Sequence, residues 1–221
     1  FSGKPTQWST EEVNGQTTFS PKFGLVYQPI LNKLSLFANY MNGFQYLTPQ
    51  KVTDANGNNP TIKIFDPERA NQWEVGAKAN LIDNKLSVTA SYYDIKVANK
   101  IMADPNNMNN SIKGGEVFSK GFELSAVGNP IKGLNIIAGF SKNRSEQVSG
   151  DSTYNGLRPE EAGPETLINF WANYKIQQGN FRNFVAGFGF NHASEHKTLN
   201  RTGIGTFELP IYTIANAMIG Y

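Results

Sequence analysis

Residues 72–93 read QWEVGAKANLIDNKLSVTASYY. In the first half, Trp73 and Val75 alternate with Glu74 and Gly76, and the second half repeats this alternation of apolar and polar residues. Successive side chains of a β-strand point to opposite faces, so a period of two predicts a strand with one apolar side. The Asp-Asn pair between the halves is typical of a tight turn. The stretch therefore predicts two antiparallel strands.

The same alternation recurs along the chain, and no segment shows a convincing helical period with caps. We expect an all-β fold with nine strands near residues 18–28, 34–46, 68–82, 85–102, 114–128, 133–146, 164–177, 182–196 and 207–221.

Composition narrows the class of protein. Hydrophobic residues make up 39% of the chain, the mean hydropathy is −0.42, and there is no cysteine. No run approaches the roughly 18 apolar residues of a membrane-spanning helix, which excludes a helical membrane protein. A spanning barrel strand alternates apolar and polar residues, so its hydropathy is low and it stays possible. The net charge of +2 gives no reason to expect a nucleic-acid partner.

The connections between the strands favour a membrane barrel. Short turns at 29–33, 83–85, 129–132 and 178–181 alternate with polar stretches at 47–67, 103–113, 147–163 and 197–206. Transmembrane barrels have short periplasmic turns and longer extracellular loops. The apolar face would contact lipid, the polar face would line the lumen, and an aromatic belt is expected at Tyr40, Tyr92, Tyr174 and Tyr212. The alternative is a soluble β-sandwich, whose strands average about 5–6 residues.

Nine strands do not close a bacterial single-chain barrel, which has an even number of strands. We therefore expect residues 1–221 to be part of a larger barrel domain.

Four motifs resemble one family. DPERANQWEVGAK at 66–78, GEVFSKGFE at 115–123, SPKFGLVY at 20–27 and LPIYT at 209–213 are similar to the later barrel half of TonB-dependent ferric siderophore receptors. The resemblance implies a transmembrane antiparallel β-barrel of 22 strands in the bacterial outer membrane, closed by an N-terminal plug domain. The plug and the last strands would then lie outside these 221 residues.

The function implied by the resemblance is import of a ferric siderophore with energy from the TonB complex. The partners would be the ferric siderophore, the TonB complex and outer-membrane lipid, without nucleic acid. Iron would be carried by the siderophore, so no cofactor or metal bound by the protein itself is expected, and no enzymatic activity. The same barrel class importing a glycan, a peptide or cobalamin is an alternative, as is a soluble β-sandwich binding module.

Candidate ligand-binding residues are the aromatic and basic side chains at the loop end. They are Phe44, Tyr46, Arg144 and Tyr154, with the arginine suited to an anionic ferric chelate. The alternative is that exposed loop aromatics pack the loops together. Lys120 falls with the apolar set, where charge at the bilayer midplane costs about 2–4 kcal/mol, so we expect it above the bilayer. Inward Glu74, Lys78 and Glu123 are expected to form ion pairs within the wall or with the plug.

Two weaker motifs point to metals. His192 and His196 have a spacing that can chelate a metal, but a polar strand end entering a loop explains them better. Residues 54–59 resemble the first half of a calcium loop, yet Phe65 stands where an EF-hand needs its closing glutamate. We expect an ordinary loop tip there.

Overall fold

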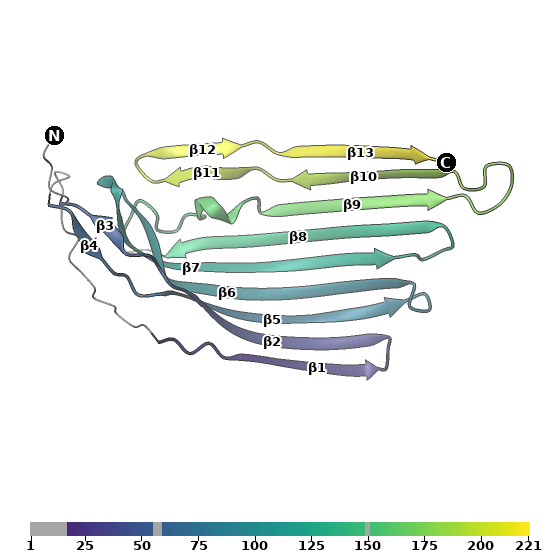
Figure 1. Ribbon diagram of the computed structural model, residues 1–221, viewed down its shortest axis with the longest axis horizontal. Helices are drawn as coiled ribbons and strands as arrows, with labels where there is room; N and C mark the ends of the chain where they lie inside the picture. Colours follow the sequence, from purple (N-terminus) through teal and green to yellow (C-terminus); the bar gives the residue numbers. More distant parts are fainter. Residues whose placement is uncertain (1–16, 55–58, 149–150) are drawn as a thin grey trace, which may run out of the picture.

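The computed structural model describes residues 17–54, 59–148 and 151–221. Its main element is a nine-stranded antiparallel sheet in the order β1-β2-β5-β6-β7-β8-β9-β10-β13 (Figure 1). The strands are β1 (Lys22–Ile30), β2 (Leu34–Gln45), β5 (Glu68–Leu81), β6 (Leu86–Asp104), β7 (Asn107–Gly128), β8 (Leu134–Val148), β9 (Thr166–Lys175), β10 (Val185–Ala193) and β13 (Tyr212–Gly220). Each strand of the sheet pairs with the next strand of the sheet along the chain, and the nearly all-strand, antiparallel structure confirms the predicted all-β fold class.

Two small hairpins and one short helix complete the described fold. They are β3 (Gln50–Val52) with β4 (Thr61–Lys63), β11 (His196–Arg201) with β12 (Gly205–Leu209), and the 3-10 helix η1 (Glu160–Ala162). Figure 1 shows both hairpins at the end opposite the short turns. Short turns therefore gather at one rim and long connections at the other, as the sequence predicts.

The prediction of a long loop over 103–113 is wrong. β6 and β7 continue to Asp104 and Asn107 as a paired hairpin, and their tight turn is closed by the Asn106 amide donating to Asp104 Oδ1 at 2.9 Å. Met102 and Ile112 pair within this extension beside Asn, Asp and Ser residues, so the sequence loses its regular alternation although the backbone stays extended. The predicted strand over 207–221 is also divided, because Pro210 has no amide proton to donate and separates β12 from β13.

The main sheet has two chemically distinct faces. Directly opposed residues on neighbouring strands share a face, so the register places the apolar sets together. We call this apolar side the outer face; it carries Leu36, Val75, Ala90, Leu124, Phe140, Phe170 and Phe188. The other side is the inner face; it carries Ser35, Lys78, Thr89, Ser125, Ser141, Asn169 and Asn173.

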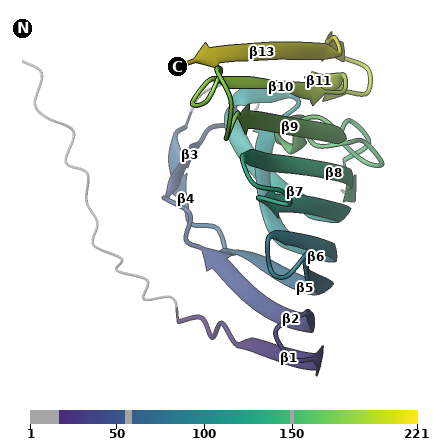
Figure 2. The ribbon, with the colours of Figure 1, turned by 90° about the vertical axis from the view of Figure 1, so that its right-hand side faces the viewer.

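The inner face is crowded, as expected on the concave side of a curved sheet. Figure 2 shows the sheet as a curved wall. A Cβ placed on Gly76 would lie 2.3 Å from the Phe37 ring and 2.7 Å from the Ala90 carbonyl oxygen. A Cβ on Gly121 would lie 2.4 Å from the Tyr93 ring. These glycines make room for large side chains that converge from neighbouring strands. Phe37, which stands between Ser35 and Asn39 on the polar side of β2, fits on the inner face because Gly76 opposite it has no side chain.

The wall is a single layer, which excludes the predicted alternative of a β-sandwich. Among the described residues, the buried hydrophobic side chains are only those of Phe65, Tyr154 and Ala193. A sandwich would bury the apolar sets of two sheets against each other. Within residues 17–54, 59–148 and 151–221, no helix is long and apolar enough to cross a bilayer.

Three of the four tyrosines predicted to form an aromatic belt share the outer face. Tyr40 and Tyr92 lie on the outer face toward the loop end, and Tyr174 lies on it next to a short turn. Tyr212 differs, because the pairing of β13 with β10 puts it opposite Ala193 on the inner face.

Filling the space at Gly76 should destabilise the wall, whereas the same change at Gly43 should not. Both glycines lie on the inner face, and nothing approaches within 4 Å of a Cβ on Gly43. Overpacking costs about 1–3 kcal/mol, so Gly76→Ala in the full-length protein should lower the urea midpoint of unfolding in detergent micelles. Equal midpoints for Gly76→Ala and Gly43→Ala would contradict the crowding of the inner face.

Candidate functional site in the loop cluster

Three connections meet at the loop end of the wall and form what we call the loop cluster. They are the β6–β7 hairpin tip (98–113), the β8–β9 connection (151–165) and the β11–β12 hairpin (196–209). They enclose a cavity of about 210 Å³, whose lining includes Lys100, Glu161 and Arg201. This polar cluster is the main candidate site at the end where a ligand would arrive from outside.

An ion pair joins the β11–β12 hairpin to η1. Arg201 donates from Nε to Glu160 Oε1 at 2.8 Å and from Nη2 to Oε2 at 3.1 Å. The Asn200 amide donates to the same Oε1 at 3.1 Å. Hydrogen bonding to Glu160 raises the pKa of the Arg201 guanidinium. Since the pair is bidentate and mostly shielded from water, it fixes the hairpin on the helix.

A second ion pair joins η1 to β6. Lys100 Nζ lies 2.8 Å from Glu161 Oε1. Burial, the largest single influence, would raise the pKa of the Glu161 carboxyl, but the hydrogen bond and charge of Lys100 together with a backbone hydrogen bond hold that pKa below its usual value. Glu160 and Glu161 are neighbours in η1, so this single helical turn is joined both to the β11–β12 hairpin and to β6.

Tyr154, one of the predicted ligand-binding residues, packs inside the loop cluster. Its side chain is buried, with only 5% of its surface exposed. The hydroxyl donates to the Ala103 carbonyl at 3.1 Å, and the Arg201 guanidinium lies 5.5 Å from the ring centroid. Burial raises the pKa of the Tyr154 hydroxyl. The placement favours the alternative reading, in which a loop aromatic packs loops together.

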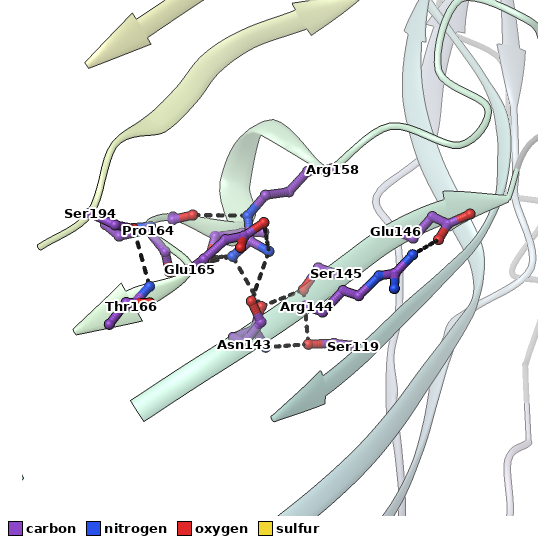
Figure 3. Close-up of polar contacts among 12 residues, drawn as sticks. Ser119, Asn143, Arg144, Ser145, Glu146, Arg158, Pro164, Glu165, Thr166 and Ser194 are labelled. Atoms are coloured by element: carbon purple, nitrogen blue, oxygen red, sulfur yellow. Dashed lines mark hydrogen bonds and ion pairs between the residues drawn. The ribbon is translucent and has the colours of Figure 1, made fainter. Parts of the chain in front are cut away.

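Arg158 fastens the β8–β9 connection to the wall (Figure 3). Its guanidinium donates to the Gly163 carbonyl at 3.1 Å, to the Asn143 carbonyl at 3.2 Å and to Asn143 Oδ1 at 3.0 Å. Asn143 in turn donates to the Tyr93 hydroxyl at 2.8 Å and to Ser119 Oγ at 2.7 Å. Burial lowers the pKa of Arg158, although a guanidinium stays charged in proteins.

Sequence reasoning missed Arg158, Glu160 and Arg201. Each lies in a segment without alternation, so no pattern connects them before the fold is known. The sequence holds one weak sign of the Arg158 site. Asn143 alternates onto the inner face, where its polar side chain can hydrogen-bond to a residue of a loop.

Phe44 and Tyr46 are the predicted pair that the structure brings together. Their rings make an edge-to-face contact with centroids 5.1 Å apart at the end of β2. Both are exposed, at 39% and 49% of their surface. Phe44 has the parity of Tyr40 and so belongs to the outer-face set.

Arg144 lies on the outer face. It stands opposite Lys120 on the neighbouring strand, and its side chain is 84% exposed. Its guanidinium nitrogen lies 3.6 Å from Glu146 Oε2, and Figure 3 shows this pair separate from the Asn143 contacts. Arg144 therefore does not join Tyr154 in the loop cluster.

The two histidines of the weaker metal motif lie on different strands, β10 and β11. His192 Nδ1 lies 2.8 Å from Thr213 Oγ1 on the sheet, whereas His196 begins β11. In the described ranges, no three His, Asp or Glu side chains are grouped to hold a metal ion. Residues 55–58 of the calcium-like stretch lie outside the described residues.

The ion pairs and hydrogen bonds of the loop cluster suit a structural role, in which they hold the connections at the loop rim in place. Pockets for small ligands usually measure about 300–1,000 Å³, so the cavity inside the loop cluster is too small for a bulky chelate. A large ligand would contact the cluster's surface and the inner face below it.

Comparison with known proteins gives a consistent result. A family model described as "TonB dependent receptor-like, beta-barrel" matches residues 2–221. The chain is 28% identical over 96% of its length to the metal-pseudopaline receptor CntO of Pseudomonas aeruginosa, and 27% identical over 86% to the ferrichrome outer membrane transporter/phage receptor of Escherichia coli. It covers 28% and 24% of those proteins, so it spans about a quarter of their length.

A solved structure has the same fold. Pseudomonas aeruginosa FpvA, determined with heterologous pyoverdines bound, superposes with a TM-score of 0.71 at 18% identity. The match covers 90% of this chain and 26% of that one.

Removing the Arg158 side chain should release the β8–β9 connection. Charged hydrogen bonds contribute about 1.5–3 kcal/mol, so Arg158→Ala should make proteinase K cleavage within 151–165 about tenfold faster. Arg182→Ala, at the opposite rim, is the matched control because Arg182 is exposed in a short turn. Cleavage at the parental rate in Arg158→Ala would show that the contacts to Asn143 do not hold the connection.

The Lys100–Glu161 pair should weaken in acid. A carboxyl with a depressed pKa stabilises the folded cluster above its ordinary pKa, which is 4.5 for Glu161, and loses that contribution as the pH falls through the depressed value. Hydrogen exchange of the amides of Arg158 and of residues 160–163 should be slower in the parent than in Glu161→Gln at pH 7, and the two should converge at acid pH. A difference that is unchanged from pH 7 into the acid range would contradict this.

Proposed function

Because the chain belongs to the TonB-dependent receptor β-barrel family, we propose that the full-length protein binds a ferric siderophore and imports it with energy supplied through TonB. Members of this family are outer-membrane receptors that act in transport. Residues 1–221 are one part of the barrel domain in this proposal, with the plug domain and the remaining strands supplied by the rest of the protein.

The observation that carries the proposal is the polar inner face beneath an ordered loop rim. The outer face is suited to lipid, while the inner face presents Glu74, Lys78 and Glu123 to the lumen. No ion pair involves these three side chains among the residues that the structure describes, which supports contacts with the plug or another part of the wall. A lumen of this kind hydrates and guides a polar cargo.

We retain Phe44 and Tyr46 as proposed ligand contacts, because they form an exposed aromatic pair where β2 ends at the loop rim, so that the outer-face parity of Phe44 does not commit the pair to lipid as it does Arg144 inside β8. For Tyr154 we propose an indirect role, in which it holds the β6–β7 hairpin against the β8–β9 connection. The outer-face position of Arg144 favours a contact other than the chelate.

A chelate of another metal is a second candidate cargo. It is favoured by the similarity to a protein named as a receptor for metal-pseudopaline. In both cases the metal is held by the cargo molecule, and the protein's own groups recognise the surface of the chelate. A glycan, a peptide or cobalamin would instead require no metal for uptake.

Deleting the full-length gene should abolish uptake of radiolabelled iron supplied as a chelate, and a protonophore should abolish it in the parent. Tyr46→Ala should weaken binding of the same chelate to the purified receptor, while the folded yield stays unchanged. Tyr174→Ala, at the opposite rim, serves as the matched aromatic control.

The outcomes separate the candidates. Iron uptake that persists without the gene, or that ignores the protonophore, would exclude the proposed function. Loss of nickel, cobalt or zinc uptake with normal iron uptake would assign the second cargo instead.

A further inference from the structure

β6 carries one more residue than β7 at the base of the hairpin tip. Val97 pairs with Val117. The next pair is Lys100 with Gly115, so β6 advances by one residue more than β7. An extra residue of this kind is a β-bulge, which bends the strand and re-aims the side chains beyond it. Within the bulge Asn99 has a φ of +60°, a left-handed conformation that asparagine adopts more readily than other residues with a Cβ.

The bulge turns Lys100 toward the inner face. In a regular strand Lys100 would share the outer face with Lys96. It stands instead opposite Gly115, which has the inner-face parity of β7. The two lysines accordingly have different partners: Lys96 Nζ lies 2.8 Å from Glu116 Oε1 on the outer face, and Lys100 Nζ lies 2.8 Å from Glu161 Oε1 of η1.

Two contacts from the chain entering β5 hold the bulge. Asn99 Nδ2 donates to the Pro67 carbonyl at 3.1 Å. The Ile101 amide, just beyond the extra residue, donates to Glu68 Oε1 at 3.1 Å. The bulge is therefore fixed on both sides of Lys100, and the direction of the hairpin tip is fixed with it.

Beyond the bulge, the hairpin tip holds two other connections. Asn110, which is 5% exposed, accepts from the Thr53 amide at 2.9 Å and donates to the Thr53 carbonyl at 2.8 Å, just after β3. The Ala103 carbonyl accepts from the Tyr154 hydroxyl of the β8–β9 connection. Figure 2 shows β3 and β4 on the concave side of the wall, and Figure 1 shows them at its loop end. The tip thus joins two connections on the lumen side of the rim.

We propose that Asn99 is a positioning residue for the cargo site. Its left-handed conformation produces the bulge, and the bulge directs Lys100 and the hairpin tip toward the lumen. The tip then holds the β3–β4 hairpin and the β8–β9 connection where arriving cargo meets the rim, so Asn99 acts through the tip and does not contact the cargo. The role toward cargo rests on the proposed function, whereas the role in ordering the rim does not.

The first test is hydrogen exchange in the full-length receptor in detergent, measured on peptides that cover residues 50–53 and 160–163. A β-branched residue disfavours a left-handed backbone, so Asn99→Val should make exchange in both segments about tenfold faster. Asn99→Gly adopts a positive φ freely and loses only the bond to Pro67, so both segments should stay within about threefold of the parent.

The matched control is Asn32→Val, because Asn32 also has a φ of +60° but lies in the short turn between β1 and β2 at the opposite rim. It should leave both segments at the parental rate. Unchanged exchange within residues 86–95, below the bulge, verifies that the barrel is folded. Where Asn99→Val does not fold, Glu68→Ala removes the acceptor of the Ile101 amide and should accelerate the same two segments.

Parental exchange in a folded Asn99→Val would overturn the proposal. Equal acceleration by the valine and glycine variants would also overturn it, because the backbone conformation of the bulge would then not be what orders the rim.

The second test concerns cargo. The parent is screened with radiolabelled ferric hydroxamate, catecholate and citrate chelates, and the release of a retained chelate is timed. Asn99→Val should release it about tenfold faster, in step with the exchange rates, while Asn99→Gly and Asn32→Val release it at close to the parental rate. Accelerated exchange with parental release would overturn the role toward cargo. A parent that retains no ferric chelate would count against the proposed function and leave the exchange result standing.

Discussion

The whole structure depends on one constraint: inside hydrocarbon, every backbone amide and carbonyl must find a partner within the protein. The nine-stranded sheet meets it by pairing each interior strand on both sides. This ladder, and not a hydrophobic core, holds the wall together, because the apolar side chains point outward to lipid. The polar side chains then lie on the opposite, inner face, so the wall is apolar on one side and polar on the other.

Curvature adds a second requirement on that polar face. Side chains converge there, so large residues need an empty position on a neighbouring strand. Phe37 over Gly76 and Tyr93 over Gly121 meet this need. Tyr93 thereby reaches Asn143, and through it the Arg158 guanidinium that holds the β8–β9 connection. Order in the loop cluster is thus linked, contact by contact, to the packing of the wall beneath it.

The strands and the alternation of rims could be predicted from the sequence because lipid and water impose a period of two on every spanning segment. Above the membrane that period disappears, so the sequence predicts loops at 103–113 and 197–206, where the structure has the extended tip of β6 and β7 and most of the β11–β12 hairpin. Residue type and nearness to the loop end are the only features of the sequence that point to the candidate ligand-binding residues. Parity within β8 places Arg144 on the outer face, but nothing in the sequence brings Glu160 to Arg201, because these residues are 41 positions apart along the chain.

Pro210 has a mechanical consequence. The β11–β12 hairpin is joined to the wall by two interruptions of the ladder, one between β10 and β11 and the other at this proline. The contacts from Glu160 to Arg201 and Asn200 fasten the hairpin across these joints. If those contacts were broken, rotation at the two joints could reshape the rim without sliding β10 against β13, so the register of the wall would be kept.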